Sequence, residues 1–210
     1  MELFRTGEVI KPDFTEKRWI NCNVSPEVFK AQFTRSVNTV MQSEGIKFDF
    51  KVDVHNKGFI NQLYFYLNGS RQFKGDPNKG ILLLGDIGCG KTFLMQTLFD
   101  MIEKLMSKVI LQVHAKNIHT EIEAKGIEYF RKRPLFVDDI GKEEKEVKVY
   151  GSVHKPFEDL IAFRYANKGV TFGTGNFNMK TYEEMYFRHL TDRMKQLFNV
   201  MILPGTSRRN

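Results

Sequence analysis

The stretch GILLLGDIGCGKT, residues 80–92, constrains the fold of this 210-residue chain more than any other part of it. A short apolar run, of the length of one buried strand, leads into a glycine-rich loop and then into Lys91 and Thr92. The next segment, residues 91–106, has apolar residues at helical spacing, namely Leu94, Leu98, Ile102 and Leu105. A buried strand, a glycine-rich loop and an amphipathic helix in direct succession predict an α/β fold.

Residues 85–92 match the pattern G-x-x-x-x-G-K-[ST], which predicts a phosphate-binding loop. Glycines let consecutive backbone N–H groups turn toward phosphate oxygens, and the N-terminus of the following helix attracts the same anion. Lys91 then supplies a cation for the β- and γ-phosphates, and the Thr92 hydroxyl can bind Mg²⁺. A chance glycine-rich turn is the alternative, but it does not explain why the loop lies between a strand and a helix. The predicted nucleotide contacts are Gly85, Asp86, Ile87, Gly88, Cys89, Gly90, Lys91, Thr92 and Phe93.

Apolar runs typical of buried strands alternate with segments of helical periodicity through the rest of the chain. This alternation predicts a parallel sheet covered by helices on both faces. The expected strands are 80–85, 108–115, 134–141, 170–176 and 199–205, and the expected helices are 91–106, 117–126, 155–169 and 181–198.

Residues 1–50 are predicted to form a small helical unit, and residues 51–210 the main domain. Ser25 and Pro26 mark the start of a helix, because serine caps helix N-termini and proline is favoured at the first helical position. Apolar residues recur at helical spacing after Pro26, and Gly45 closes the segment.

The composition favours a basic protein of the cytoplasm. The net charge of +7 and pI of about 9.3 favour a polyanionic partner such as nucleic acid, although the lysines and arginines are scattered. No stretch approaches the roughly 18 apolar residues of a membrane span, and no signal peptide is evident. Two distant cysteines, Cys22 and Cys89, fit a reducing compartment. We therefore expect a cytoplasmic protein without a membrane partner.

Two acidic residues, Asp138 and Asp139, follow the apolar start of the strand expected at 134–141. Ligands of open parallel sheets bind beyond the carboxyl ends of the strands, so these carboxylates should face the phosphate loop. Asp138 is the better Mg²⁺ partner, directly or through water. Asp139 would orient the attacking water. A solvated pair of loop charges is the alternative.

Two further side chains are candidates with open alternatives. Asn176 ends an expected strand, where it could hold a water against the γ-phosphate, but a lone asparagine there is commonly a turn residue. Arg193 could pair locally with Asp192 or Glu184, or it could project into the nucleotide of a neighbouring subunit.

The ordered set GDIGCGKT, LFVDDIG, TFGTGNFN, LTDRM and GTSRR resembles the AAA+ ATPases of the DnaC-type helicase loader and IstB-type transposition helper group, over roughly residues 60–208. The resemblance implies a five-stranded parallel sheet of order 5-1-4-3-2. It also implies ATP and Mg²⁺ as ligands and assembly into a homo-oligomer on ATP binding. Its implied partners are single-stranded DNA and a replicative helicase, or a transposase, with the helicase held by the N-terminal unit.

The resemblance also implies roles for single residues. Residues 85–92 would be the Walker A loop, Asp138 the Walker B metal partner and Asp139 the acid that polarises water. Asn176 would be the sensor residue. Arg193 would be the arginine finger, with Arg188 as the second choice.

The sequence departs from the family pattern in two places. Asp139 stands where many AAA+ enzymes have glutamate, so hydrolysis could be slow. No C-terminal lid domain is expected after residue 205, so the second sensor arginine that such a lid carries would have to be replaced by Arg208 or Arg209.

Four functions compete at this point. The first is an ATPase that loads a replicative helicase onto single-stranded DNA during DNA replication. The second is a transposition helper, the third a small-molecule kinase, and the fourth a nucleotide-dependent switch with little hydrolysis.

Residues 141–155, GKEEKEVKVYGSVHK, are expected to be a mobile loop that contacts DNA, with a solvated surface hairpin as the alternative.

Overall fold

The computed structural model describes residues 19–47, 49–149 and 151–208. The start of the predicted N-terminal unit and Arg209 therefore lie outside the described residues.

A five-stranded parallel sheet forms the centre of the molecule, with the spatial order β2-β3-β6-β1-β7. Counted along the chain, β6 is the fourth strand of this sheet and β7 the fifth, so the order 5-1-4-3-2 is confirmed. The strands are β1 (Gly80–Leu84), β2 (Leu111–His114), β3 (Leu135–Ile140), β6 (Thr171–Gly175) and β7 (Phe198–Ile202).

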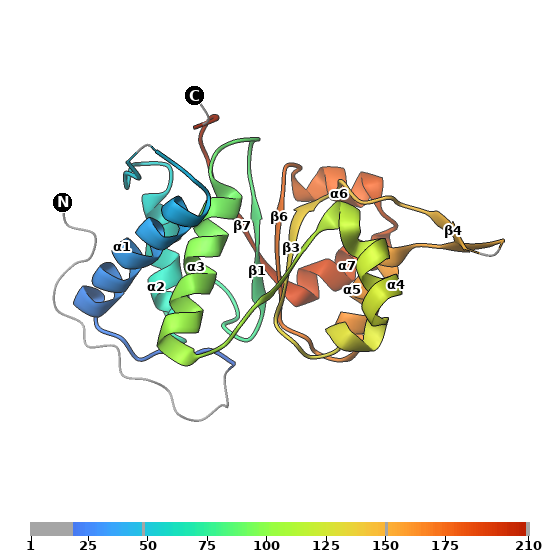
Figure 1. Ribbon diagram of the computed structural model, residues 1–210, viewed down its shortest axis with the longest axis horizontal. Helices are drawn as coiled ribbons and strands as arrows, with labels where there is room; N and C mark the ends of the chain where they lie inside the picture. Colours follow the sequence, from blue (N-terminus) through green and yellow to red (C-terminus); the bar gives the residue numbers. More distant parts are fainter. Residues whose placement is uncertain (1–18, 48, 150, 209–210) are drawn as a thin grey trace.

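Helices cover both faces of this sheet, as the continuous apolar strands require (Figure 1). All five residues of β1 are buried. Since successive side chains of a strand point to opposite faces, Ile81 and Leu83 belong to one core cluster while Leu82 and Leu84 belong to the other.

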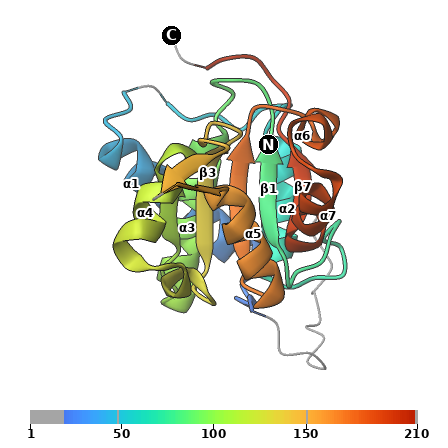
Figure 2. The ribbon, with the colours of Figure 1, turned by 90° about the vertical axis from the view of Figure 1, so that its right-hand side faces the viewer.

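The two helical layers are formed by different parts of the chain, as Figures 1 and 2 show. The first layer is α1 (Pro26–Ser43), α2 (Lys57–Leu67) and α3 (Lys91–Met106). The second layer is α4 (Ile118–Lys125), α5 (Pro156–Ala166), α6 (Met179–Met185) and α7 (Arg188–Leu197), with short 3-10 turns at Ala115–Asn117 and Ile127–Phe130. Among the described residues, no helix is long and apolar enough to cross a membrane.

The N-terminal helix α1 begins where the sequence predicts. The Ser25 side chain caps it by accepting a hydrogen bond from the Val28 backbone N–H at 3.4 Å, and Pro26 is its first residue. Its apolar face, including Phe29 and Phe33, belongs to the same core cluster as Ile81 of the sheet. The division of the chain at residue 50 stays a prediction.

The single helix expected over residues 181–198 is wrong. Tyr186 and Phe187 have extended backbones between α6 and α7. The Tyr186 ring stacks on Tyr182 at 5.9 Å, and its hydroxyl donates a hydrogen bond to Glu143, which lies outside both helices. The long-range hydrogen bond to Glu143 and the local stacking on Tyr182 stabilise the interruption, and helical periodicity cannot reveal the first of these contacts.

The mobile loop expected over residues 141–155 is wrong in part, and the surface hairpin given as its alternative is present. Two short antiparallel strands, β4 (Val147–Val149) and β5 (Ser152–His154), form a hairpin there. This β4–β5 hairpin projects from the body of the molecule (Figure 1). Residues 141–146 connect the hairpin to the carboxyl end of β3, where the candidate acidic residues lie.

Candidate functional site

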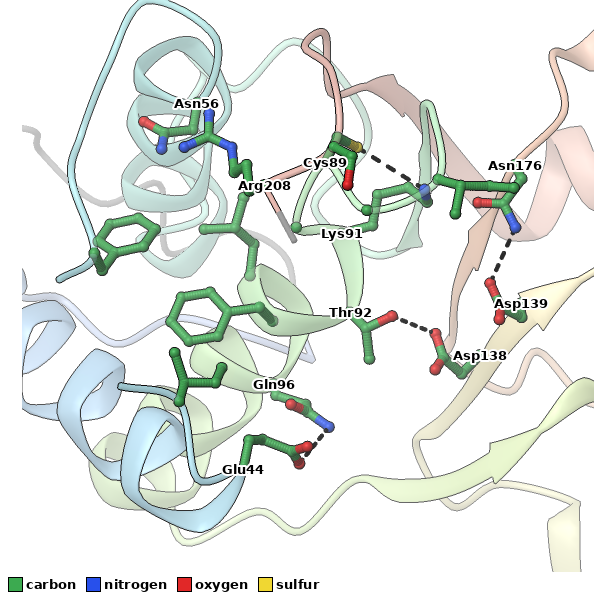
Figure 3. Close-up of a pocket in the computed structure, with 18 of the residues that line it drawn as sticks. Glu44, Asn56, Cys89, Lys91, Thr92, Gln96, Asp138, Asp139, Asn176 and Arg208 are labelled. Carbon is green, nitrogen blue, oxygen red and sulfur yellow. Dashed lines mark hydrogen bonds between the residues drawn. The ribbon is translucent and has the colours of Figure 1, made fainter. Parts of the chain in front are cut away.

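A cleft of about 1020 Å³ lies at the carboxyl ends of the central strands. The phosphate-loop residues from Ile87 to Phe93 line one side, and Asp138, Asp139 and Asn176 line another (Figure 3). The segment between α1 and α2 supplies a third side, including Phe50 and Asn56. The phosphate loop, the acidic pair and Asn176, which were predicted separately from the sequence, therefore meet in one cavity, and the segment between α1 and α2 was not predicted to line it.

The loop between β1 and α3 has the backbone that the glycines allow. Gly88 and Gly90 have φ angles of 82° and 99°, in the left-handed region that residues with a side chain rarely adopt. A Cβ on Gly88 would lie 2.4 Å from the Ser207 hydroxyl oxygen. The helix α3 begins at Lys91, so its free N–H groups adjoin the cleft. An anion in the cleft would meet these donors.

The Lys91 side chain is held in the loop rather than in solvent. Only 5% of the residue is exposed, and its ammonium donates hydrogen bonds to the carbonyl oxygens of Gly85 at 2.9 Å and Asp86 at 2.8 Å. Burial lowers the pKa of Lys91, and the neighbouring acidic groups offset part of this effect. The ammonium is thus positioned at the mouth of the loop, where phosphate oxygens can replace the carbonyls.

Thr92 and Asp138 place two oxygen atoms that can ligate a cation next to each other in the cleft. The Thr92 hydroxyl donates a hydrogen bond to Asp138 Oδ1 at 2.9 Å (Figure 3). A hydroxyl and a carboxylate are the hard oxygen ligands that Mg²⁺ prefers, and Mg²⁺ commonly uses one or two such protein ligands together with phosphates. The two oxygen atoms therefore fit magnesium, and the binding of Mg²⁺ by Thr92 and Asp138 stays a prediction.

A distortion of β3 turns both acidic residues toward the cleft. Strict alternation along a strand would place Asp138 and Asp139 on opposite faces. The pairing of β3 with β6 shifts register between Val137 and Ile140, and Asp139 has a φ of 59°. This bulge is the structural reason why both carboxylates line one cavity.

The Asp139 carboxylate has partners from three other segments. Asn176 Nδ2 donates to Oδ1 at 3.2 Å, Lys142 Nζ lies 2.6 Å from Oδ2, and His114 Nε2 lies 3.6 Å from Oδ2. Burial raises the pKa of this carboxyl, but Lys142, Asn176 and His114 together outweigh burial and hold the pKa below its usual value. Asn176 therefore lies at the edge of the sheet where it was expected. The contacts of Lys142 and His114 with Asp139 were not predicted from the sequence.

Thr174 is a further residue that the sequence reasoning missed. Its buried hydroxyl donates a hydrogen bond to Asp138 Oδ1 and accepts one from the Asp139 backbone N–H at 2.9 Å. Thr174 thus orients the Asp138 carboxylate and stabilises the bulge at Asp139. Its position in the segment TFGTGN, two residues before Asn176, could have indicated from the sequence that Thr174 lies near the site.

Replacing Thr174 by valine is expected to lower ATP turnover about tenfold, because residues that orient metal ligands typically contribute 10- to 100-fold. Turnover by the purified variant measures this effect. Thr97→Val is the matched control, because the Thr97 hydroxyl is equally buried but bonds only the Phe93 carbonyl within α3. Equal turnover in the Thr174 and Thr97 variants would contradict the positioning role.

The structure places Arg193 and Arg188 away from this cavity. Both lie on α7, and neither lines the cleft. In the described part of the chain, no ion pair joins Arg193 to Asp192 or Glu184. The role of Arg193 stays a prediction.

Arg208 lies at the cleft, close to the phosphate loop. Its backbone N–H donates to the Gly88 carbonyl at 2.9 Å, and its guanidinium pairs with Asp53 at 2.7 Å. The second-sensor role considered for Arg208 stays a prediction.

Comparison with solved structures identifies the fold. DnaI is 22% identical with a TM-score of 0.58, covering 89% of this chain and 94% of its own. The DnaC helicase loader is 16% identical with a TM-score of 0.56, covering 83% and 99%. The replication initiator DnaA bound to AMPPCP and single-stranded DNA is 17% identical with a TM-score of 0.53, covering 75% of this chain and 49% of its own. No protein-family model matches the sequence, and no curated protein matches it. The chain therefore has the fold of DnaI and of the DnaC helicase loader, as the resemblance of the sequence implied.

Proposed function

We propose that this chain binds ATP with Mg²⁺, hydrolyses it, and loads a replicative helicase onto single-stranded DNA during replication. The observation that carries the proposal is the convergence of Lys91, Thr92, Asp138, Asp139 and Asn176 on one cleft. A phosphate cradle, a magnesium-type donor pair and a second carboxylate are together the parts that phosphoryl transfer to water requires.

The phosphate loop and Lys91 bind the triphosphate in this proposal. The backbone N–H groups of the loop surround the phosphates, and the ammonium of Lys91 moves from the loop carbonyls to the β- and γ-phosphate oxygens. Thr92 and Asp138 would hold Mg²⁺, which when bound neutralises charge on those phosphates.

In this proposal Asp139 accepts the proton of the attacking water, and Asn176 positions Asp139. The water oxygen bonds to the γ-phosphorus while the bond from that phosphorus to the β–γ bridging oxygen breaks, giving ADP and inorganic phosphate. The proton lost by the water passes to the Asp139 carboxylate, and the Asn176 amide keeps that carboxylate in place. A carboxylate 3.2 Å from the side-chain amide of the residue that directly follows strand β6 can do this without a change in fold.

The proposed partners follow from the loaders and initiator that share the fold. The DnaC structure is that of a helicase loader, and DnaA was solved with single-stranded DNA. The net charge of +7 suits a DNA partner. Arg193 lies outside the cleft of its own subunit, so in an ATP-dependent oligomer it could complete the site of a neighbour.

ATP turnover against protein concentration tests this proposal. Specific activity is expected to rise with concentration and to respond to a single-stranded oligonucleotide, because Arg193 of one subunit acts at the cleft of the next. Arg193→Ala is expected to be inactive alone, and mixing it with Lys91→Ala protein should restore part of the turnover. Lys195→Ala, on the same helix, is the matched control and should behave as wild type.

The shared site would be refuted if the specific activity did not change with protein concentration or with DNA, and if mixing the two variants restored no turnover. Direct binding to a purified replicative helicase, compared with a transposase, separates the loader from a transposition helper.

A further inference from the structure

A group of exposed cations lies at the end of the sheet opposite to the cleft. Residues 131–133 precede β3 and Lys168 precedes β6, so both turns lie at the amino ends of these parallel strands. The cleft lies at the carboxyl ends of the strands, and none of these residues lines it. Figure 2 has the carboxyl ends at the top of the view and the two turns at the bottom. The proposed ATP site therefore leaves these side chains without a role.

Arg164, which is fully buried, holds the two turns together. Its guanidinium donates to the Arg133 carbonyl at 3.0 Å in the first turn and to the Val170 carbonyl at 2.6 Å in the second. A Cβ on Gly169 would lie 2.9 Å from the Arg131 carbonyl oxygen, so the two backbones are in direct contact. The side chains that both turns expose are thus presented from one support rather than from two independent loops.

We call the exposed side chains of Arg131, Lys132, Arg133, Tyr165 and Lys168 the basic face. Arg131 pairs with Glu128 at 2.6 Å. No other cation of this face forms an ion pair with a carboxylate of the described residues, and the same holds for the buried Arg164 that contacts both turns. Unpaired like charges in one place create a positive potential that attracts a polyanion.

The end of helix α5 explains only part of this charge. A cation is favoured at a helix C-terminus, and Lys168 lies two residues after α5 ends. Lys168, however, has a φ of 52°, in the left-handed region where glycine is the favoured residue after a helix. Lys132 and Arg133 follow a 3-10 turn of four residues, Ile127–Phe130, whose dipole is small. Local backbone requirements therefore do not account for these three cations.

Planar side chains accompany the cations of the basic face. The exposed Arg133 guanidinium lies over the Tyr129 ring, 4.4 Å from its centroid. Tyr165 is 39% exposed, and its carbonyl accepts a hydrogen bond from the Lys168 N–H at 3.2 Å. Unpaired bases stack on arginine planes and aromatic rings, whereas the bases of a duplex are already stacked and an acidic peptide has none. The basic face therefore fits a single-stranded nucleic acid better than either.

We propose that the basic face binds single-stranded DNA, with its two lysines and Arg133 contacting phosphates and Tyr165 stacking on a base. The inference rests on the proposed function, which supplies the DNA partner, and it adds where on the chain that partner is held. This place differs from residues 141–155, which the sequence suggested for DNA and which follow the carboxyl end of β3. A strand on the basic face leaves the cleft open, so this contact does not require bound nucleotide.

Fluorescence anisotropy of labelled oligo-dT, without nucleotide, tests the inference. The triple variant K132Q/R133Q/K168Q loses three phosphate contacts, so binding is expected to weaken about tenfold or more, and the slope of log K against log salt should fall by about 2. The matched control K30Q/R35Q/K180Q removes the same charges from exposed positions on α1 and α6. It should bind within about twofold of wild type with an unchanged salt slope.

Single variants separate stacking from charge and binding from folding. Tyr165→Leu is expected to raise Kd about fivefold or more without changing the salt slope, because stacking releases no counterions, and Tyr165→Phe should bind as wild type. Lys168→Gly should also weaken binding. Its thermal unfolding temperature should nevertheless equal or exceed that of wild type, because glycine adopts the φ of 52° without strain.

The inference alone is overturned if wild type binds oligo-dT and K132Q/R133Q/K168Q binds no more weakly than the control variant, or if Tyr165→Leu binds as wild type. Displacement of labelled oligo-dT by polyglutamate as complete as by unlabelled oligo-dT of equal charge would overturn it in favour of an acidic protein partner. Wild-type protein that binds no oligo-dT would instead refute the DNA partner of the proposed function and the inference with it.

Discussion

Lys91→Ala is expected to lower ATP turnover by about 10²- to 10³-fold, the cost of removing one preorganised group that stabilises transferred charge. Lys91 is 5% exposed and its ammonium is positioned by two loop carbonyls, so no solvent cation replaces it with the same geometry. Binding of a fluorescent ATP analogue should weaken as well, because Lys91 also contacts the ground-state phosphates. Initial-rate assays and equilibrium titration measure the two effects.

Lys104→Ala is the matched control for Lys91→Ala. Lys104 is an exposed lysine in the last turn of the same helix, α3, and lies outside the cleft. Its loss should leave turnover unchanged. Turnover by Lys91→Ala above about one tenth of the wild-type rate would contradict the assignment of the phosphate loop.

Arg164 is the residue whose replacement should most affect stability. It is fully buried on α5, and its guanidinium donates to the carbonyls of Phe130, Arg133 and Val170 and to the Thr171 hydroxyl. No carboxylate of the described residues forms an ion pair with it. Burial lowers the pKa of Arg164 to about 10, so it remains charged at neutral pH. One side chain thus joins the segments that lead into β3 and β6.

Arg164→Leu is expected to lower the free energy of unfolding by about 3 to 5 kcal/mol, because the carbonyls of Phe130 and Arg133 lose the donor that Arg164 supplies and Val170 keeps only its bond from the Leu135 N–H. Urea unfolding followed by the fluorescence of Trp19 measures the change. Trp19 is the single tryptophan, and its ring contacts Phe172 of β6 at 5.7 Å, so it reports on this part of the core.

Lys132→Ala is the control for Arg164→Leu, since Lys132 is exposed in the neighbouring turn and should change stability by less than about 0.5 kcal/mol. Arg164→Lys should fall between wild type and Arg164→Leu, because one ammonium replaces fewer of the four hydrogen bonds. A loss below about 1 kcal/mol in Arg164→Leu would show that water or a rearrangement satisfies the carbonyls.

The local patterns of the sequence predicted the elements that position the site. The phosphate loop, its strand and its helix were each readable because glycine conformation and apolar periodicity act over a few residues. Asp138 and Asn176 could be placed at the cleft because parallel strands bring their carboxyl ends to one edge. The strand order came from the resemblance to the DnaC-type group and is confirmed.

Other features depended on contacts between distant segments. The break between α6 and α7 follows from Tyr186 meeting Glu143, and the bulge at Asp139 follows from the Thr174 hydroxyl on β6. Neither is visible in a window of helical or strand periodicity, which predicts one helix and a regular strand.

The sequence by itself determined which residues can bind phosphate and which strands are buried, because backbone freedom and hydrophobic spacing are local properties. The sequence also predicted that Asp138 and Asp139 face the phosphate loop. Only the tertiary structure decided that a bulge in β3 turns both side chains into the cleft and that Lys142 forms an ion pair with Asp139. It also decided that Arg164 is buried and that no carboxylate of the described residues pairs with it. Each of these depends on atoms brought together by the sheet, and ion pairs and hydrogen bonds act only at such short distances.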